Sequence, residues 1–338
     1  MSDTANNSVA GARRAPSSAP LQVHAWSIEY IRLKAFALAI RTVIGGLSPI
    51  AELFFQKVPK EVEKVKTSIP SRQPGRSIKV HIYTPKDAPQ GKKLPVHLNL
   101  HGSGFVIPSL GSDAEFCGEM AKRLECVVID CDYRKAPEHP APAQMQDAED
   151  CILWALTQDS KYDISRASVG GFSAGANLAL CVAGLHGDHL TACISFYPPT
   201  DFQVSRYRKE APEKHSAAIP PAVSKFFDRC YLVAGTDRAD PTVSPVEQDT
   251  KKFPPHVWVM CATGDTLYHD GEKFIEKLVK EGHPDARFHK ITGEGHAFDK
   301  FAKSGTPTAQ KKTEVYDAAM QMVHDSWKDS PRREGAKL

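Results

Sequence analysis

The stretch Gly171-Phe172-Ser173-Ala174-Gly175 decides the fold of this chain. A short apolar segment, residues 167–170, precedes it, and a helix-favouring segment, residues 176–183, follows it. This order is typical of a nucleophile elbow, in which a serine occupies a tight turn between a strand and a helix. The flanking glycines are needed because a side chain there would clash with the neighbouring strand and helix. The pattern also arises by chance in about one chain in ten of this length, so other motifs must support it.

A second stretch, His101-Gly102-Ser103-Gly104-Phe105, directly follows a predicted strand. Ester hydrolysis needs preorganised N–H groups that bind the oxyanion of the tetrahedral intermediate, and loss of one donor typically costs about 2.7–4 kcal/mol. Small residues after a strand allow the backbone N–H groups of Ser103 and Gly104 to face the reacting carbonyl. The N–H of Ala174, next to the nucleophile, completes the predicted oxyanion hole. The alternative is an ordinary glycine turn, and His101 is expected to organise the loop.

A serine nucleophile needs a general base, and the base needs an orienting acid, in the chain order serine, acid, histidine. Of the 14 histidines, His296 is the candidate base because it lies in a glycine-containing loop after the last predicted strand. A surface histidine in a turn is the alternative. Asp265 is the candidate acid because it follows a strongly apolar predicted strand. Its nearest rival, Asp270, is expected to cap the following helix.

These motifs resemble the hormone-sensitive-lipase-like group of α/β-hydrolases, a class IV-like family of bacterial esterases. That family is marked by an H-G-G-G-type loop, a G-D-S-A-G elbow, an acid in a D-P-L-R-D-E-type stretch and a final G-x-x-H-x-F-like loop. The corresponding stretches here are residues 101–105, 171–175, 265–270 and 295–298. Residues 132–140 are similar to the family's D-Y-R-L-A-P-E-H-P segment, and we expect them to form a buried salt bridge and a turn. The resemblance implies an α/β-hydrolase fold with a helical cap.

Two residues depart from the family pattern. Ser103 replaces a glycine of the oxyanion loop, and we hypothesise that its hydroxyl enters the pocket and narrows access for bulky groups. An unchanged substrate range in Ser103→Gly would refute that hypothesis. Phe172 replaces the usual acid beside the nucleophile, which suggests an apolar contact where relatives place a charge. Neither change removes a catalytic group.

The order of apolar segments predicts the architecture. Predicted strands lie at residues 77–84, 95–100, 126–130, 167–170, 192–197, 256–262 and 287–291, and predicted helices at 113–124, 143–157, 176–183, 271–280 and 307–327. Such alternation predicts an α/β fold with a mainly parallel central sheet and helices on both faces.

The segments outside this alternation suggest a cap and two flexible ends. The predicted divisions are a disordered N-terminus at 1–20, N-terminal cap helices at 21–60, a catalytic domain at 61–328 with a cap insertion at about 201–241, and a flexible tail at 329–338. Pro49 is expected to break the N-terminal segment into two helices. A membrane-surface element is the alternative for that segment.

Four phenylalanines are candidates for the wall of the substrate pocket: Phe105, Phe172, Phe226 and Phe227. For Phe226 and Phe227 the alternative is ordinary packing of the helix expected at 222–232.

Composition limits the classes of partner. The 338 residues include 43 basic and 40 acidic side chains, and no basic cluster with interleaved aromatic residues suggests nucleic-acid binding. The eight cysteines are scattered without a C-x-x-C, so we expect neither a metal site nor a disulfide framework, and the proposed chemistry needs no cofactor. The polar start and the lack of an apolar run of ~20 residues predict an intracellular protein without an integral membrane segment.

The last three residues, Ala336-Lys337-Leu338, are a conservative variant of the Ser-Lys-Leu peroxisomal address. They predict binding to a peroxisomal import receptor, and a chance polar tail in a cytoplasmic protein is the alternative. A homodimer is a further possible assembly.

The predicted function is hydrolysis of small-to-medium hydrophobic carboxylic esters through an acyl-enzyme. Ser173 is expected to attack the carbonyl, His296 to carry the proton, and Asp265 to orient His296. Two alternatives remain open. One is a peroxisomal thioesterase or an esterase that acts on a secondary-metabolite intermediate. The other is a non-catalytic ligand-binding homologue, against which the presence of His296 argues.

Overall fold

The computed structural model describes residues 27–55, 57–215 and 218–328. The segment predicted to be disordered, residues 1–20, and the tail with Ala336, Lys337 and Leu338 lie outside the described residues. Within the described ranges, every helix falls short of the length and apolar character that a membrane crossing requires.

The described residues form one eight-stranded sheet in the order β1-β2-β4-β3-β5-β6-β7-β8. The strands are β1 (Val62–Pro70), β2 (Ser77–Pro85), β3 (Leu94–Leu100), β4 (Val127–Cys131), β5 (Tyr162–Phe172), β6 (Ala192–Phe196), β7 (His256–Ala262) and β8 (Asp285–Ile291). The β1–β2 and β2–β4 pairs are antiparallel. All other pairs are parallel, which confirms the predicted, mainly parallel sheet.

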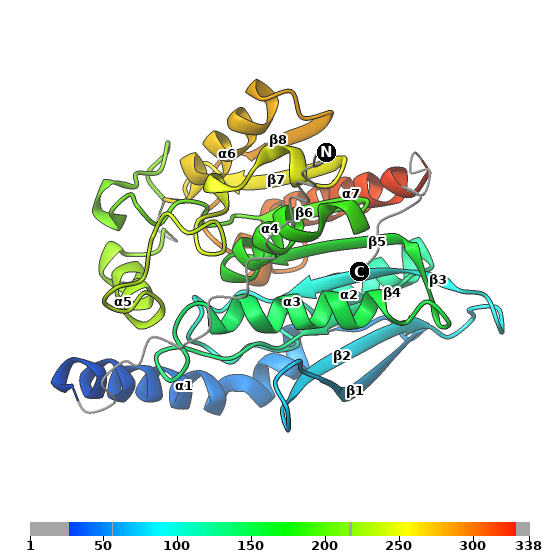
Figure 1. Ribbon diagram of the computed structural model, residues 1–338, viewed down its shortest axis with the longest axis horizontal. Coiled ribbons are helices and arrows are strands. Elements are labelled where there is room, and N and C mark those ends of the chain that lie inside the picture. The colour runs from blue at the N-terminus through cyan, green and yellow to red at the C-terminus, as the bar shows by residue number, and fades with distance from the viewer. Residues whose placement is uncertain (1–26, 56, 216–217, 329–338) are drawn as a thin grey trace, which may run out of the picture.

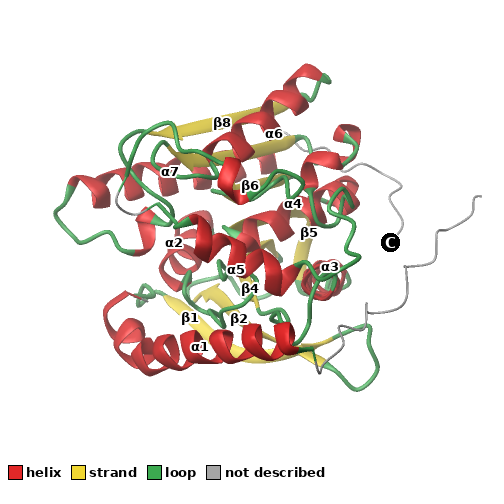
Figure 2. Cartoon of the chain, turned by 90° about the vertical axis from the view of Figure 1, so that its left-hand side faces the viewer, coloured by secondary structure: helices red, strands yellow, loops and turns green. Residues whose placement is uncertain are grey.

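Helices cover both faces of this sheet. The α-helices are α1 (Ile28–Phe55), α2 (Ala114–Leu124), α3 (Ala143–Leu156), α4 (Ala174–His186), α5 (Pro221–Tyr231), α6 (Tyr268–Lys280) and α7 (Pro307–Lys328). Short 3₁₀ helices are η1 (Gly187–His189), η2 (Arg206–Arg208), η3 (Pro245–Glu247), η4 (Thr250–Lys252) and η5 (Phe298–Lys300). Figure 2 shows α2 and α7 on one side of the sheet and α3 and α4 on the other.

The central strands are mostly apolar because both faces of the sheet are covered. Every residue of β3, β4 and β6 is buried, as expected for parallel strands between two helical layers. The edge strand β1 differs, since only Val62 and Ile69 of its nine residues are buried. All eight cysteines are free and buried in this structure.

The N-terminal segment is one helix, so the prediction of a break at Pro49 is wrong. The helix α1 runs from Ile28 to Phe55 without interruption. A proline in a helix interior removes one backbone hydrogen bond, but the bonds on either side of it persist and hold the helix together.

Helices α1 and α5 lie side by side at one end of the molecule (Figure 1). The ring of Phe36 on α1 meets the ring of Phe226 on α5 edge to face, with centroids 4.7 Å apart. Arg41 of α1 forms two hydrogen bonds of 2.9 Å to the carboxylate of Glu138. These contacts join α1 both to the insertion that carries α5 and to the segment after β4.

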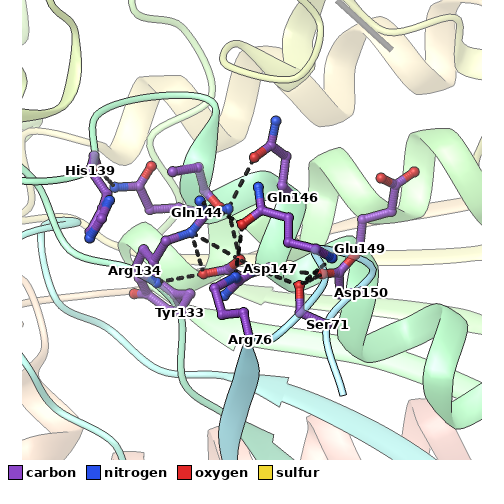
Figure 3. Close-up of polar contacts among 12 residues, drawn as sticks. Ser71, Arg76, Tyr133, Arg134, His139, Gln144, Gln146, Asp147, Glu149 and Asp150 are labelled. Atoms are coloured by element: carbon purple, nitrogen blue, oxygen red, sulfur yellow. Dashed lines mark hydrogen bonds and ion pairs between the residues drawn. The ribbon is translucent and has the colours of Figure 1, made fainter. Parts of the chain in front are cut away.

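Residues 132–140 connect β4 to α3 through a network of charged groups (Figure 3). The backbone N–H of Arg134 donates to Asp147 Oδ2 at 2.8 Å, and its guanidinium donates to the same carboxylate. Arg76, which precedes β2, donates to Asp147 as well. Asp147 is almost fully buried, and burying a carboxylate without such partners is costly. The network therefore supports the structural role that we expected for this segment.

Candidate active site

Ser173 occupies the turn between β5 and α4 in a backbone conformation that L-residues rarely adopt, with φ +52° and ψ −117°. Its N–H donates to the carbonyl of Phe196 at 2.9 Å, and its own carbonyl accepts from the N–H of Asn177 at 3.1 Å. A Cβ on Gly171 would lie 2.6 Å from the carbonyl oxygen of Leu100, and a Cβ on Gly175 would clash with the same carbonyl. Both glycines therefore let β5 and α4 approach β3 closely enough to form the elbow.

The three predicted triad residues lie together in one chain of contacts. His296 Nε2 is 3.0 Å from Ser173 Oγ, and His296 Nδ1 is 2.6 Å from Asp265 Oδ2. The other carboxylate oxygen of Asp265 accepts from the N–H of Leu267 at 2.9 Å. Asp265 is fully buried and His296 is 9% exposed. An ionised carboxylate only accepts hydrogen bonds, so Asp265 keeps the proton on Nδ1 and leaves Nε2 free to accept from Ser173.

The sheet brings these residues together from distant parts of the chain. Ser173 directly follows β5, Asp265 follows β7 and His296 follows β8. Because these strands are parallel, their carboxyl ends meet at the same edge of the sheet.

Tyr197 packs against the imidazole of His296, and this contact was not predicted from the sequence. Its ring meets the imidazole of His296 edge to face with centroids 4.7 Å apart, and its hydroxyl donates to Asp299 Oδ1 at 2.7 Å. Tyr197 has φ +44°, which is strained for a bulky residue, and Ala297 has φ +56°. An aromatic residue at the end of β6, next to the elbow strand, was the available sequence signal.

The predicted oxyanion residues Ser103, Gly104 and Ala174 line the same cavity as Ser173 and His296. Among the described residues, the N–H groups of Ser103 and Gly104 have no acceptor. Ala174 is the first residue of α4, where backbone N–H groups have no partner within the helix. Gly104 has φ +57°, and a Cβ there would lie 2.7 Å from the ring of Phe227. The arrangement can therefore offer unpaired donors to an oxyanion.

The cavity has a volume of about 440 Å³. Phe105, Phe172 and Phe227 lie on its wall, as predicted for pocket residues. Phe226 does not line it, because adjacent residues of a helix point in directions about 100° apart and Phe226 faces α1. Arg206 and Asp228 form a salt bridge at the wall, with Arg206 Nε 2.9 Å from Asp228 Oδ2.

Phe172 is fully buried and supports the floor of the cavity. Its ring stacks on Phe196 with centroids 4.3 Å apart, and Lys300 Nζ lies 3.3 Å from the ring centroid. The ammonium of Lys300 is 2.9 Å from Asp113 Oδ1 and 3.0 Å from Asp299 Oδ2. Burial alone would lower the pKa of Lys300, but the two carboxylates raise it above its usual value, so Lys300 stays charged. Lys300 was not predicted as a site residue, because no motif near it in the sequence indicates its contact with Phe172.

Asp270 does not cap its helix, so that prediction is wrong. It lies inside the first turn of α6, and its carboxylate accepts from Thr200 N at 3.0 Å and from Lys209 Nζ. The charge of the buried Lys209 holds the carboxylate against the insertion and away from the helix N-terminus.

His101 stacks on Tyr133, and among the described residues it forms no hydrogen bond with Ser173. Among the described residues, no cluster of three potential metal ligands is present.

Residues 97–300 match the model of a family with the α/β-hydrolase fold. An AB hydrolase superfamily protein of Schizosaccharomyces pombe is 25% identical over 281 residues, which cover 78% of this chain and 77% of that protein. Probable carboxylesterase 9 of Arabidopsis thaliana is 30% identical over 248 residues, which cover 63% of this chain and 76% of that protein. The solved structure of an esterase from Pyrobaculum calidifontis is 27% identical with a TM-score of 0.73, and the match covers 86% of this chain and 92% of that chain.

The fold and the site thus define an α/β-hydrolase, and the chain belongs to that family. Within it, the resemblance to the hormone-sensitive-lipase-like esterases is confirmed.

Proposed function

We propose that this protein is a serine carboxylesterase that hydrolyses small-to-medium hydrophobic esters through an acyl-enzyme. One observation carries the proposal: the imidazole of His296 contacts both Ser173 Oγ and Asp265 Oδ2. The relatives named carboxylesterase and the esterase structures of the same fold support the reaction class.

In the proposed mechanism, Ser173 Oγ attacks the ester carbonyl and His296 Nε2 accepts the hydroxyl proton. The N–H groups of Ser103, Gly104 and Ala174 donate to the oxyanion. His296 then gives the proton to the departing alcohol, which leaves an acyl group on Ser173. A water molecule, deprotonated by His296, then attacks this acyl-enzyme. The bond between Ser173 Oγ and the acyl carbon breaks, His296 returns the proton to Oγ, and the carboxylic acid leaves, while Asp265 stabilises the imidazolium in both steps.

The cavity supports the proposed substrate class. Its volume of about 440 Å³ lies in the usual range for sites that bind small molecules. The wall is largely apolar, and Phe105, Phe227 and Leu267 contribute to it. A hydrophobic acyl or alkyl group would therefore be desolvated next to Ser173.

The test is hydrolysis of p-nitrophenyl esters from acetate to laurate by the wild type and by Ser173→Ala. We expect activity that peaks at short or medium chains and falls by at least about 10³-fold in Ser173→Ala. Acyl-CoA thioesters belong in the same series, because the triad also cleaves thioesters. A wild type that cleaves none of the esters while retaining its fold would contradict the proposal and favour the thioesterase or ligand-binding alternatives.

A peroxisomal location and a homodimer stay predictions. A fluorescent fusion that keeps the native C-terminus tests the peroxisomal location.

A further inference from the structure

The loop that carries the predicted oxyanion donors is held in an unfavourable backbone conformation. Gly104 and Phe105 have φ values of +57° and +63°. Glycine tolerates such a value, but a bulky residue like Phe105 adopts it only where the surroundings hold the loop. On one side, the ring of Phe105 stacks on Tyr231 of α5 with centroids 3.8 Å apart. On the other side, the backbone N–H of Phe105 donates to Ser103 Oγ at 2.9 Å.

Ser103 Oγ belongs to a chain of hydrogen bonds whose direction is fixed. Tyr133 Oη lies 2.6 Å from Ser103 Oγ and donates to the carbonyl oxygen of His101 at 2.6 Å. A carbonyl oxygen only accepts, so the single hydroxyl proton of Tyr133 is used there. The hydroxyl of Ser103 must therefore donate to Tyr133 Oη while its oxygen accepts from Phe105. The chain joins both ends of the oxyanion loop, His101 and Phe105, to one tyrosine.

Several contacts hold Tyr133, the tyrosine of this hydrogen-bond chain, in place. Its side chain is almost fully buried, and its ring stacks on His101 with centroids 4.7 Å apart and an interplanar angle of 15°. Its backbone N–H donates to Asp132 at 2.9 Å. The next residue, Arg134, is bound to Asp147 of α3, and Figure 3 shows Tyr133 beside this network. Burial raises the pKa of Tyr133 well above its usual value, so the phenol stays protonated.

We propose that Ser103 is a positioning residue whose hydroxyl, through Tyr133, holds the N–H groups of Ser103 and Gly104 in place to bind the oxyanion. This inference rests on the proposed esterase function. The family pattern has a glycine at this position, and a glycine cannot supply this bond. The hydroxyl is occupied by two protein partners, which favours the positioning role over the narrowing of the pocket that the sequence suggested.

The positioning role predicts a loss of kcat with little change in KM, because the oxyanion develops only during the reaction. We expect Ser103→Ala and Tyr133→Phe each to lower kcat for p-nitrophenyl butyrate by about tenfold, in proportion to one lost hydrogen bond. KM should stay within about twofold. The double variant should lose no more than the stronger single variant, because both changes break the same chain. Ser103→Thr, which keeps the hydroxyl, should recover most of kcat.

A transition-state analogue separates positioning from general stability. A trifluoromethyl ketone adds to Ser173 and forms an oxyanion-like adduct, so its affinity should fall in Ser103→Ala by the same factor as kcat/KM. Ser326→Ala is the matched control: Ser326 Oγ is also buried and hydrogen-bonded, to Val323 O at 2.7 Å, but it lies on α7. This control should keep kcat and inhibitor affinity even if its melting temperature falls.

The outcomes are distinguishable. A wild type without esterase activity refutes the proposed function itself. An active wild type with unchanged kcat and inhibitor affinity in Ser103→Ala overturns the positioning role, as does a widened substrate range at unchanged kcat. Additive losses in the double variant would also overturn it. If Ser103→Ala does not fold, Tyr133→Phe decides, because it keeps the stacked ring and removes only the hydroxyl.

Discussion

At the scale of single residues, the site depends on strained backbone held by specific neighbours. Ser173, Tyr197 and Ala297 all have positive φ values, and each is next to or part of the triad. Such strain persists only where surrounding contacts compensate for it. Here the hydrogen bonds from Ser173 to Phe196 and from Tyr197 to Met260 supply those contacts. The serine oxygen is thereby presented to His296 before any substrate binds.

The buried Asp265, the acid of the proposed triad, gives the first prediction. In Asp265→Asn the amide can donate, so it no longer requires a proton on His296 Nδ1, and Nε2 can then carry the proton instead. We expect kcat to fall by about 10³–10⁴-fold, with an unchanged circular dichroism spectrum. The measurement is steady-state hydrolysis of p-nitrophenyl butyrate, with Ser173→Ala as the floor. Retention of more than a tenth of kcat would show that Asp265 does not orient the base.

At the scale of elements, α5 uses neighbouring residues for different contacts. Phe226 packs on Phe36 of α1, Phe227 lies against Gly104, and Asp228 binds Arg206 of η2. Tyr231, one turn further on, stacks on Phe105. One short helix therefore touches α1, the wall of the cavity and the oxyanion loop, so the packing of α5 determines the space beside the nucleophile.

Two adjacent residues of α5 give the second prediction. Phe227→Ala removes a ring that covers Gly104, so we expect the rate for branched acyl esters to rise relative to that for butyrate by severalfold. Phe226→Ala is the matched control, because the same side chain is removed from the face that contacts α1. We expect it to lower the melting temperature but to leave the ratio of the two rates unchanged. Competition between p-nitrophenyl pivalate and butyrate measures this ratio, and equal ratios in both variants would contradict the assignment.

At the scale of the whole molecule, a buried polar cluster makes stability depend on pH. Asn99 Nδ2 donates to Asp113 Oδ2 at 3.0 Å and to Asp130 Oδ1 at 2.9 Å. Both carboxyl groups are buried between the sheet and α2. Burial, and next the charge of Asp113, raise the pKa of Asp130 to about 7. The folded protein therefore binds a proton at pH values where the unfolded chain has released it.

This cluster gives the third prediction. The unfolded carboxyl group has a pKa of about 3.9, so Asp130 contributes stability that is complete below pH ~4 and is lost as pH rises through ~7. We expect the free energy of unfolding of the wild type, minus that of Asp130→Asn, to fall over this window by up to about 1.4 kcal/mol per pH unit. Chemical denaturation at pH 5, 6, 7 and 8 measures this difference. A difference for Asp130→Asn that stays constant over these pH values would refute the assignment.

The segments that the sequence predicted well are those with a strong local signal. The strands β3 and β7 are rich in apolar residues and lie next to glycine- or proline-containing turns, and both formed close to the predicted residues. The strand β1 was not predicted, because Val62–Pro70 is mostly polar and pairs only with β2 at the edge of the sheet. The uninterrupted α1 was also not predicted. A proline taken by itself indicates a helix break, but the hydrogen bonds of the rest of the helix are not visible in that local signal.

The sequence alone determined the elbow and the alternation of strands and helices, because each is a pattern of residues close together along the chain. Only the tertiary structure decided which side chains from distant segments of the chain contact one another. The hydrogen bond from Ser103 to Tyr133 joins residues from two different loops, and Lys300 lies against Phe172 from beyond the last strand. The sequence showed Ser103 and Phe172 as departures from a pattern but gave no partner for either. Those partners follow from the sheet, whose parallel strands bring the carboxyl ends of distant segments to one edge.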